Sequence, residues 1–503
     1  MEKPPRLAST TVTGTADASN SDSGAAELFY VLVLVGSSTE SHRLGQAGFL
    51  WPGEELCIGR GDDKHKYVKL GFHRPGEPLV VIPGQEFLAG EKMSRLQLRF
   101  KTTSEGVMMK KVGRRATYLN AKDIGEEWIL LKEGDLIHVA KQVLMRLGRR
   151  PKVLPPQVRT RKLQPFGEAD EVGRVGESYN AWVDRRAVDV AASRSGEHIL
   201  IYGETGTGKE LAAAAIHKRS KRAHGPFVAI NAAGIPRQLI DAELFGIKGG
   251  FLDGRSTMSN GVVGDSDKGT LFLDEIGECP GDTQTSLLRM LETRTYRRVG
   301  ESIARPVDVR VVGATHQGDK AFRKDFRGRF QIVIELHSLD DRRDDLVLIA
   351  RFLLVDMVRV KDAPEDLDAE VNQELRERLF FQGPSGKLAP RMSLFLLEYL
   401  MLHPLKRNTR ELREILLKAL LSSTGEEITL PGVDKVIAAP SAEPGGDDGG
   451  GPMREIGKEE LLLALQTTGN NKTQAAKLLR IGRTGFYALM ARHGMKVGSD
   501  STE

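Results

Sequence analysis

The sequence predicts a multidomain chain with an N-terminal all-β sandwich, a central α/β domain with a helical lid, and a C-terminal all-α domain. The hydrophobic pattern changes along the chain from short strand-like runs, to strands alternating with helices, to short amphipathic helices. Segments rich in Pro, Gly or small polar residues lie between these parts. The length of 503 residues agrees with about three domains. The predicted boundaries are a disordered arm at 1–27, the sandwich at 28–150, a linker at 151–166, the α/β subdomain at 167–340, the lid at 341–437, a linker at 438–452 and the all-α domain at 453–497.

Residues 1–27 are rich in Ser, Thr, Ala and Gly and contain few large apolar side chains. A segment of this composition cannot bury enough apolar surface to offset its conformational entropy, so we expect a disordered arm. The sandwich that follows is predicted from apolar runs at 29–35, 79–82 and 96–100, which Gly and Pro residues separate.

The central domain is predicted from four strand-like runs that alternate with helical patterns. The runs lie at 198–202, 226–230, 270–273 and 307–313. Alternation of this kind is typical of a parallel sheet that helices cover. Residues 341–437 show mainly helical periodicity, which predicts the lid.

A glycine-rich loop joins the first of these strands to an alanine-rich helix. Glycines let backbone N–H groups approach phosphate oxygens, and the helix N-terminus adds positive potential. Lys209 would add a point charge. The loop therefore predicts ATP binding by Gly203, Glu204, Thr205, Gly206, Thr207, Gly208, Lys209 and Glu210.

Two acids, Asp274 and Glu275, follow the apolar run 270–273. They would lie at the C-terminal edge of the sheet, where α/β proteins bind their ligands. The general phosphate-loop pattern ends in Ser or Thr, which holds Mg²⁺, but Glu210 stands there in this chain. Mg²⁺ must then depend on other carboxylates, so we expect Asp274 to hold it and Glu275 to polarise the attacking water. The alternative is a glycine-rich turn beside an unrelated acidic strand end.

Four segments of the central domain form a set: GETGTGKE at 203–210, AELFG at 242–246, GTLFLDEIG at 269–277 and REL at 410–412. This set resembles the AAA+ domain of sigma-54-dependent transcriptional activators, also called bacterial enhancer-binding proteins. The resemblance covers about residues 172–425, and flanking parts extend it to most of the chain. It implies an ATPase that assembles into a ring, commonly a hexamer, and it makes Glu210 a regular family residue.

The resemblance also implies roles for single residues. Asn231 matches the polar residue that positions the catalytic glutamate according to nucleotide state. Arg323 and Arg329 match two arginine fingers that would reach the γ-phosphate bound by a neighbouring subunit, where an arginine neutralises developing charge. Thr315 matches a sensor position, and Arg410 matches the sensor arginine of the lid. Without the motif, a single arginine is more often a solvated surface charge.

Parts of the family pattern are altered in this chain. His316 follows Thr315 where the family has a sensor Asn. The run at 403–408 is longer than its family counterpart, which affects the expected geometry of the lid.

The loop with which this family grips sigma-54 is altered as well. Its family sequence is Gly-Ala-Phe-Thr-Gly-Ala, whereas this chain keeps Phe251 but has Leu252 in place of the threonine and Asp253 in place of the glycine. Leu cannot make a hydroxyl hydrogen bond, and Asp adds charge where a small, flexible residue is needed. We expect impaired or lost sigma-54 remodelling, the alternative being a tolerated variant that still contacts sigma-54. The candidate loop comprises Gly249, Gly250, Phe251, Leu252, Asp253 and Gly254.

Short motifs in the sandwich, at 56–60, 94–97 and 117–120, resemble those of a forkhead-associated domain. Such domains bind phosphothreonine peptides on loops at one end of a β-sandwich. The ligand would be a phosphothreonine-containing protein or a phosphorylated threonine of the chain's own N-terminal arm. Where the family has a His three residues after the serine, this chain has Gln97. The alternative to phosphopeptide binding is a sandwich kept only for contacts within the protein. The resemblance implies that Arg60, Ser94 and Arg95 hold the phosphate and that Asn120 fixes the peptide backbone.

A helix-turn-helix pattern at 470–489 follows an apolar-striped helix at 458–465 and is similar to the Fis-type domain of the same family. Residues 453–496 hold eight Lys or Arg against three Glu, a local excess of positive charge that suits DNA. The alternative is a small basic bundle that contacts proteins. The expected DNA contacts are base edges for Arg483, Thr484 and Tyr487, and phosphates for Lys472, Lys477 and Arg492.

The overall composition predicts a cytoplasmic protein with no membrane association. The formal net charge of +5 is too small to show a nucleic-acid partner by itself. Two cysteines, Cys57 and Cys279, lie far apart and fit a reducing compartment. No apolar run approaches the ~18 residues that span a bilayer, and the N-terminus lacks the apolar stretch of a signal peptide.

Two functions are compatible with these features. The favoured one is an ATP-dependent regulator that senses phosphothreonine, binds upstream activating or operator DNA, and acts on sigma-54 RNA polymerase. The alternative is a sigma-54-independent repressor or scaffold in which ATP controls only oligomerisation, and the altered loop at 249–254 favours it.

Overall fold

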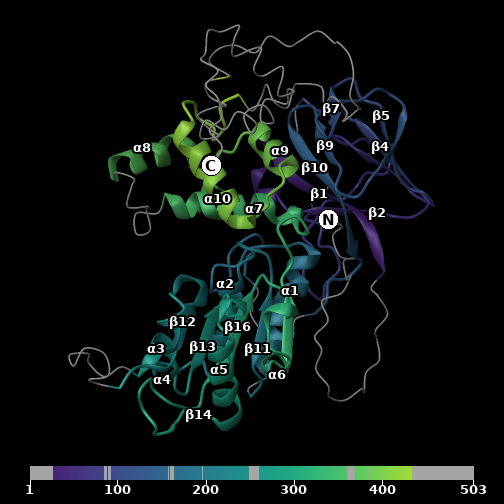
Figure 1. The fold of residues 1–503 in the computed structure, drawn as a ribbon. Helices are drawn as coiled ribbons and strands as arrows, with labels where there is room; N and C mark the ends of the chain where they lie inside the picture. The colour runs from purple at the N-terminus through teal and green to yellow at the C-terminus, as the bar shows by residue number, and fades with distance from the viewer. Residues whose placement is uncertain are drawn as a thin grey trace, which may run out of the picture. The chain divides into compact units, whose positions relative to one another are not determined.

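In the computed structural model, the described residues form parts of two compact units, 1–440 and 441–503 (Figure 1). Residues 1–26 of the predicted arm, the linker at 438–452 and, apart from Leu461, the predicted all-α domain lie outside the described residues. The structure describes residues 27–83, 88, 92–156, 158, 164–194, 196–248, 260–358, 369–383, 386–432 and 461.

The N-terminal part consists of two antiparallel sheets packed face to face, so the predicted all-β organisation is confirmed. Alternate residues of one strand, Leu32 and Leu34, belong to the core between the sheets, together with Met145 of the neighbouring strand and Phe100 of the facing sheet. The first sheet has the order β2 (Ala47–Leu50), β1 (Leu28–Ser37), β10 (Val143–Pro151), β9 (Leu136–Val139), β6 (Thr117–Leu119) and β7 (Lys122–Asp123). The second has the order β3 (Glu55–Ile58), β4 (Leu98–Thr103), β5 (Gly106–Lys111) and β8 (Trp128–Leu131).

One predicted strand and one predicted linker boundary need correction. The run at 79–82 forms only an isolated bridge between Val80 and Phe72, and Val80 is exposed. The predicted linker begins inside β10, because that strand continues to Pro151, and Leu154 is buried beyond it. The chain from 151 to 156 is therefore part of the folded structure.

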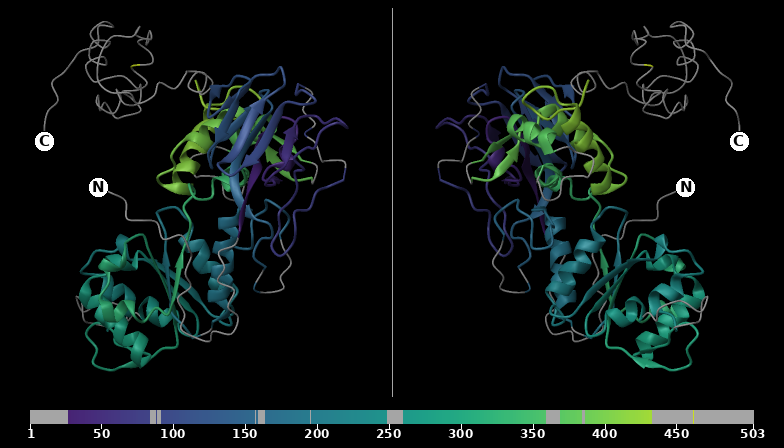
Figure 2. Two further views of the ribbon diagram at one scale, coloured as in Figure 1. Left: turned by 90° about the vertical axis from the view of Figure 1, so that its right-hand side faces the viewer. Right: turned by 90° about the vertical axis from the view of Figure 1, so that its left-hand side faces the viewer.

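The central domain is a five-stranded parallel sheet with helices on both faces (Figure 2). The four predicted strands are present, and a fifth, β17, lies at one edge. Alanine-rich faces of α1 (Tyr179–Ser193) and α2 (Lys209–Lys218) pack on one side of the sheet, and α5 (Gly281–Thr293) packs on the other. The sheet order is β12 (Phe227–Asn231), β13 (Thr270–Asp274), β16 (Arg310–Thr315), β11 (Ile199–Tyr202) and β17 (Ile332–Glu335).

The predicted lid is mainly helical. Ser178 caps α1 through its side chain, and Ser393 caps a lid helix in the same way. The lid contains α7 (Leu346–Met357), α8 (Ala369–Leu379), α9 (Leu394–Leu402), α10 (Asn408–Ser422) and the hairpin of β18 (Phe380–Gln382) with β19 (Leu388–Pro390). Smaller elements of the central domain are α3 (Ile240–Phe245), α4 (Gly261–Asp265), α6 (Lys324–Arg327), β14 (Thr295–Tyr296) and β15 (Arg305–Pro306).

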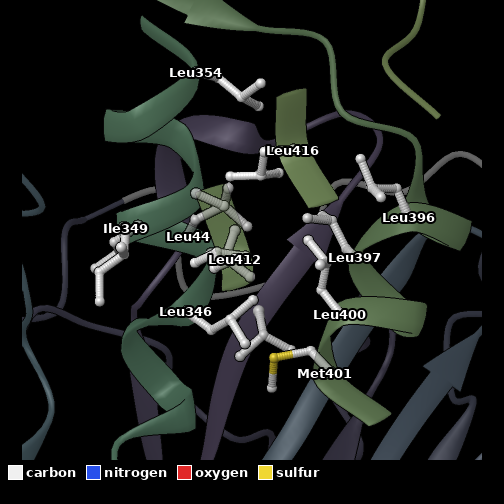
Figure 3. Close-up of a cluster of buried hydrophobic side chains, with 14 of the residues drawn as sticks. Leu44, Leu346, Ile349, Leu354, Leu396, Leu397, Leu400, Met401, Leu412 and Leu416 are labelled. Atoms are coloured by element: carbon white, nitrogen blue, oxygen red, sulfur yellow. The ribbon is translucent and has the colours of Figure 1, made fainter. Parts of the chain in front are cut away.

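The sandwich and the lid share one hydrophobic core. The face of β1 that points away from the sandwich core carries Val31, Val33 and Val35, and these side chains join the cluster of lid leucines. Figure 3 shows Leu44 of the sandwich part among side chains of α7, α9 and α10, including Leu412. As a result, β1 is buried on both of its faces.

Buried polar pairs also join these two parts. His138 Nδ1 lies 2.8 Å from Glu398 Oε2, and both side chains are almost fully buried. Arg146 and Arg150 donate to the two oxygens of Asp344 over 2.7 and 3.2 Å. Burial alone would raise the pKa of Asp344, but the two guanidinium groups hold it below its usual value. The sandwich is thus fixed to the lid by polar as well as apolar contacts.

A helix that crosses a membrane must be both long and apolar. Among the described residues, no helix meets both requirements.

Candidate active site

The glycine-rich loop connects β11 to α2 and requires glycine at two positions. Gly206 and Gly208 have φ values of +80° and +90°, in the left-handed region that favours glycine. A Cβ on Gly206 would also lie 2.3 Å from the carbonyl oxygen of Arg407 in the lid. The loop can therefore keep this path only with glycine at these places.

Lys209 lies in the first turn of α2 and is largely buried. Its Nζ donates to the carbonyl oxygen of Gly203 over 3.0 Å and lies 3.5 Å from Glu275 Oε1. The structure therefore brings the lysine of the loop and one of the two predicted acids to the same place.

Asp274 and Glu275 stand at the carboxyl end of β13, as the sequence predicts for acids that follow a parallel strand. Burial and the neighbouring charge of Glu275 raise the pKa of Asp274. Burial also acts to raise the pKa of Glu275, but hydrogen bonds from His316 and the charge of Lys209 outweigh it, so that pKa is lowered. The lowered pKa favours the ionised form of Glu275 beside Lys209.

His316 is the residue that holds Glu275. Its Nδ1 lies 2.8 Å from Glu275 Oε2, and its backbone N–H donates to the same oxygen over 3.3 Å. The sequence marked His316 only as a departure from the family pattern. The contact depends on β13 and β16 being neighbours in the sheet, which the sequence alone does not show.

The two other predicted residues at the strand ends make different contacts. The carboxamide oxygen of Asn231 accepts from the backbone N–H of Ala233 over 2.9 Å, so the side chain caps a short 3-10 turn. Asn231 is nevertheless in register with Asp274 on the neighbouring strand. Thr315 is fully buried, and its hydroxyl accepts from the backbone of Gln317.

The N-terminus of α10 packs on the phosphate loop. Asn408 donates to the carbonyl oxygen of Thr205 over 3.0 Å and is fully buried, with φ +52°. Thr409 Oγ1 donates to the carbonyl oxygen of Gly206 over 2.6 Å. Arg410 follows them, is exposed, and lies near enough to Asp274 for its charge to oppose part of the rise in the pKa of that acid. The longer run at 403–408 thus still delivers the predicted sensor arginine to this site.

Arg323 and Arg329 flank α6 and are both exposed. Arg323 donates to both carboxylate oxygens of Asp325, and Arg329 pairs with Glu292 of α5. Neither pair is deeply buried, so solvent screens both of them. The two guanidinium groups could therefore exchange these partners for another anion at low cost.

The predicted magnesium site agrees with the residues present. Among the described residues, no group of three or more His, Cys, Asp or Glu could enclose a metal ion. Mg²⁺ usually binds through one or two carboxylates, with water and substrate phosphates as its other ligands. Asp274 beside the phosphate loop fits that requirement.

The motif residues of the sandwich lie on adjoining loops. The backbone N–H of Arg60 donates to the carbonyl oxygen of Ser94 over 3.1 Å, and the side chains of Arg60 and Arg95 are exposed. Gln97 is fully buried, and its Nε2 donates to the carbonyl oxygen of Arg115 over 2.9 Å. This contact ties the segment at 94–97 to the loop that precedes β6.

Asn120 directly follows β6, and its side chain makes two hydrogen bonds within the sandwich. Its Nδ2 donates to Asp135 Oδ1 over 2.8 Å, and its Oδ1 accepts from the backbone of Leu136 over 2.9 Å. The carboxamide thus joins the turn after β6 to the start of β9. The predicted sigma-54 loop at 249–254 and all the predicted DNA contacts from 472 to 492 lie outside the described residues.

Comparisons with known proteins agree with the division of the chain. Residues 174–337 match the model of the sigma-54 interaction domain, and residues 452–493 match that of the Fis family of bacterial regulatory proteins. The transcriptional regulatory protein ZraR of Klebsiella oxytoca is 36% identical over 304 residues, which cover 58% of this chain and 63% of ZraR. This chain therefore spans less than two thirds of that relative.

A longer match is to a protein of Geobacillus stearothermophilus that is named limonene hydroxylase. It is 31% identical over 405 residues, covering 76% of this chain and 70% of the relative. Among solved structures, NtrX from Brucella abortus in complex with ADP matches with a TM-score of 0.43 and 24% identity, covering 65% of this chain and 70% of that one.

Proposed function

Because the chain belongs to the sigma-54-dependent transcriptional regulators, which carry a sigma-54 interaction domain and a Fis-type DNA-binding domain, we propose that it hydrolyses ATP to regulate transcription from DNA-bound sites. The observation that carries this proposal is the meeting of Lys209, Asp274 and Glu275 beside the phosphate loop. A cation, a Mg²⁺ ligand and a base at one sheet edge are the groups that phosphoryl transfer to water requires.

In this mechanism the backbone of the phosphate loop and Lys209 bind the phosphates of ATP. Asp274 would hold Mg²⁺, which neutralises charge on the phosphates when it is bound. Glu275 orients the attacking water, and its lowered pKa keeps it ionised at neutral pH. His316 fixes the direction of the Glu275 carboxylate.

Arg323 and Arg329 complete the site from a neighbouring subunit in a ring, which we propose to be a hexamer. This role is supported by their exposure and by the weak, screened pairs that they now make. Arg410 reports the nucleotide state to the lid from the start of α10, where Asn408 and Thr409 contact the phosphate loop directly.

The enzyme proposal is tested by ATP turnover of the whole chain. Glu275→Gln keeps the shape of the side chain but removes the base, and Arg323→Ala removes one finger. We expect both variants to lose most turnover, by about 10²-fold or more, while Glu275→Gln still binds ATP. Wild-type turnover at the level of Glu275→Gln would refute hydrolysis.

The output on RNA polymerase is proposed in two forms. The family match supports contact with sigma-54, whereas Leu252 and Asp253 favour a sigma-54-independent repressor or scaffold in which ATP controls assembly. A pull-down of sigma-54 with the nucleotide-trapped wild type and with Leu252→Thr separates them. Capture by the wild type supports remodelling. Capture by neither form excludes it and leaves the scaffold function.

The sandwich is proposed to bind a phosphothreonine peptide near Arg60, Ser94 and Arg95. Support comes from the direct contact between their loops and from the exposure of both arginines. A phosphothreonine peptide from the N-terminal arm, around Thr10, should bind the wild type and bind Arg60→Ala at least about tenfold more weakly. Equal binding of the unphosphorylated peptide would contradict this proposal.

DNA binding is proposed for residues 453–497 because residues 452–493 match the Fis family. Lys472→Ala should weaken binding to all sequences alike and flatten the salt dependence, whereas Arg483→Ala should relax base preference. Binding isotherms at several salt concentrations, measured with target and unrelated DNA, distinguish the two effects.

A further inference from the structure

A second basic site lies at the sheet edge opposite the phosphate loop. A cavity of about 260 Å³ opens at the N-terminal ends of β11, β16 and β17, next to the end of α5. Its walls include four arginines but only two acids. The basic lining residues are Arg222, Arg294, Arg310, Arg329 and His198.

Both acids of the cavity are already engaged. Asp308 Oδ1 accepts from Arg222 over 2.6 Å, and Glu292 pairs with Arg329. Arg294 has no side-chain hydrogen bond or ion pair with any residue that the structure describes. The cavity therefore keeps an excess of positive charge after its internal pairs are formed.

Arg310 supplies the strongest sign that a ligand is missing. Its side chain is buried, with 2% of the residue exposed. Its Nε donates to the carbonyl oxygen of Glu197 and its second terminal nitrogen to that of Ala191, but the remaining terminal nitrogen is buried without a partner. A buried N–H of a cation without an acceptor is costly, so an anion in this cavity would be stabilised.

His198 adds a neutral donor to the same wall. The backbone N–H of Val311 donates to His198 Nδ1 over 3.1 Å, which places the ring proton on Nε2. Burial and the charge of Arg310 lower the pKa of His198 to about 4, so the ring stays neutral and keeps this tautomer at physiological pH.

We propose that this cavity binds a phosphate group, either inorganic phosphate or the phosphate of a larger molecule. Guanidinium groups match the geometry of phosphate oxygens, and the volume admits a phosphate with several waters at ~30 Å³ each. The ligand would also hold Arg329 at the cavity wall. Because Arg329 is a proposed arginine finger, phosphate would then inhibit ATP turnover from a site separate from the phosphate loop. This inhibition rests on the proposed function, whereas the binding of phosphate to the cavity does not.

Binding is tested by thermal unfolding of the whole chain in inorganic phosphate, with KCl at equal ionic strength as the reference. A Lys209→Ala background removes the contribution of the phosphate loop. We expect the rise in Tm to persist in that background and the phosphate affinity to fall at least about tenfold in Arg294→Gln. Arg289→Gln changes an exposed arginine of α5 that does not line the cavity, and it should leave the shift intact.

The outcomes separate the sources of the phosphate group. A shift with inorganic phosphate assigns the site to the free ion, and a shift with ADP alone in the Lys209→Ala background assigns it to a larger molecule. Absence of both shifts, or full shifts in both Arg294→Gln and Arg310→Lys, overturns the site.

A kinetic experiment tests the inhibition. Phosphate should lower kcat in the wild type without raising KM for ATP, and should not do so in Arg294→Gln. Binding without that inhibition overturns the role of Arg329. If the chain shows no ATPase activity, the proposed function fails, but the binding test can still be carried out.

Discussion

The side chain of His316 reaches Glu275 across the ends of two neighbouring strands, β13 and β16. Lys209 contacts the other oxygen of the same carboxylate. A carboxylate that is held on both oxygens has a fixed direction, which is what the orientation of a water molecule requires. At the residue scale, therefore, the site is set by few contacts, and each of them can be removed separately.

Replacing His316 tests this positioning role. His316→Ala should lower kcat for ATP about tenfold and change KM little, because the glutamate loses its direction while the phosphate loop stays intact. His316→Asn restores a side-chain donor and should recover part of kcat. The exposed His224 provides the control, since His224→Ala should leave both constants unchanged. A parallel fall of all three variants would contradict the role.

A second residue predicts how stability depends on pH. Burial raises the pKa of Glu177 from 4.5 to about 7, and its Oε1 accepts from the backbone of Gly167 over 2.8 Å. The folded chain keeps a proton there that the unfolded chain releases above its ordinary pKa. This contribution to stability is therefore complete below pH 4.5 and is lost as pH rises through about 7.

Glu177→Gln, which is neutral at every pH, should remove that dependence. The unfolding free energy of the variant, relative to that of the wild type, should therefore be higher at pH 8 than at pH 5, by about 2 to 3 kcal/mol. Denaturant titrations at the two pH values measure it. The exposed Glu127 serves as the reference, and an equal pH response in Glu127→Gln would exclude Glu177 as the cause.

At the scale of elements, β1 carries a signal that sequence reasoning used only in part. Its run LFYVLVLV has no polar alternation, and an uninterrupted apolar run is expected when both faces of a strand are buried. One face fills the sandwich core and the other meets the lid. The four predicted strands of the central sheet were recognisable because helical patterns separate them, whereas β17 is short and follows the polar segment around α6.

The candidate site could be predicted to a similar extent. Lys209, Asp274 and Glu275 stand in local motifs, so the sequence alone places them at strand and helix ends. The contacts of His316, Asn408 and the cavity arginines depend on strand order and on lid packing. These are properties of the tertiary structure that no local pattern in the sequence contains.

The contribution of α9 to the shared core can be measured within one helix. Leu400 is fully buried against the cluster that joins lid and sandwich, whereas Leu402 is 41% exposed. Leu400→Ala should lower the unfolding free energy by about 2 to 5 kcal/mol, because it removes buried methyl groups and leaves a cavity. Leu402→Ala should change it by less than about 0.5 kcal/mol. Equal losses in denaturant titrations would show that α9 is not packed as described.

At the scale of the whole molecule, residues far apart in sequence hold the sandwich on the lid. Asp344 lies next to the start of α7 and neutralises Arg146 and Arg150 of β10. Arg150 is buried to 1% exposure, so it depends on this partner. A ligand of the sandwich that disturbed β10 would therefore act on α7, in the helical part that also contacts the phosphate loop.

Asp344→Ala tests this connection. It leaves Arg150 as a buried charge without compensation and should lower the unfolding free energy by about 3 to 5 kcal/mol. Thermal unfolding should then show the sandwich separating before the central domain melts. Asp340→Ala breaks a half-exposed pair with Arg343 and should have an effect below about 1 kcal/mol. A single unchanged transition in Asp344→Ala would disprove the dependence.

The two-sided burial of β1 also limits how this protein can be recombined. A sandwich from a relative would fit only if it carried a matching row of small apolar side chains on the outer face of its first strand, opposite α9. Transplanting the sandwich without its lid would expose Val31, Val33 and Val35 together, an apolar patch that favours aggregation. Exchange of this sandwich for another should therefore succeed only when sandwich and lid are moved as a pair.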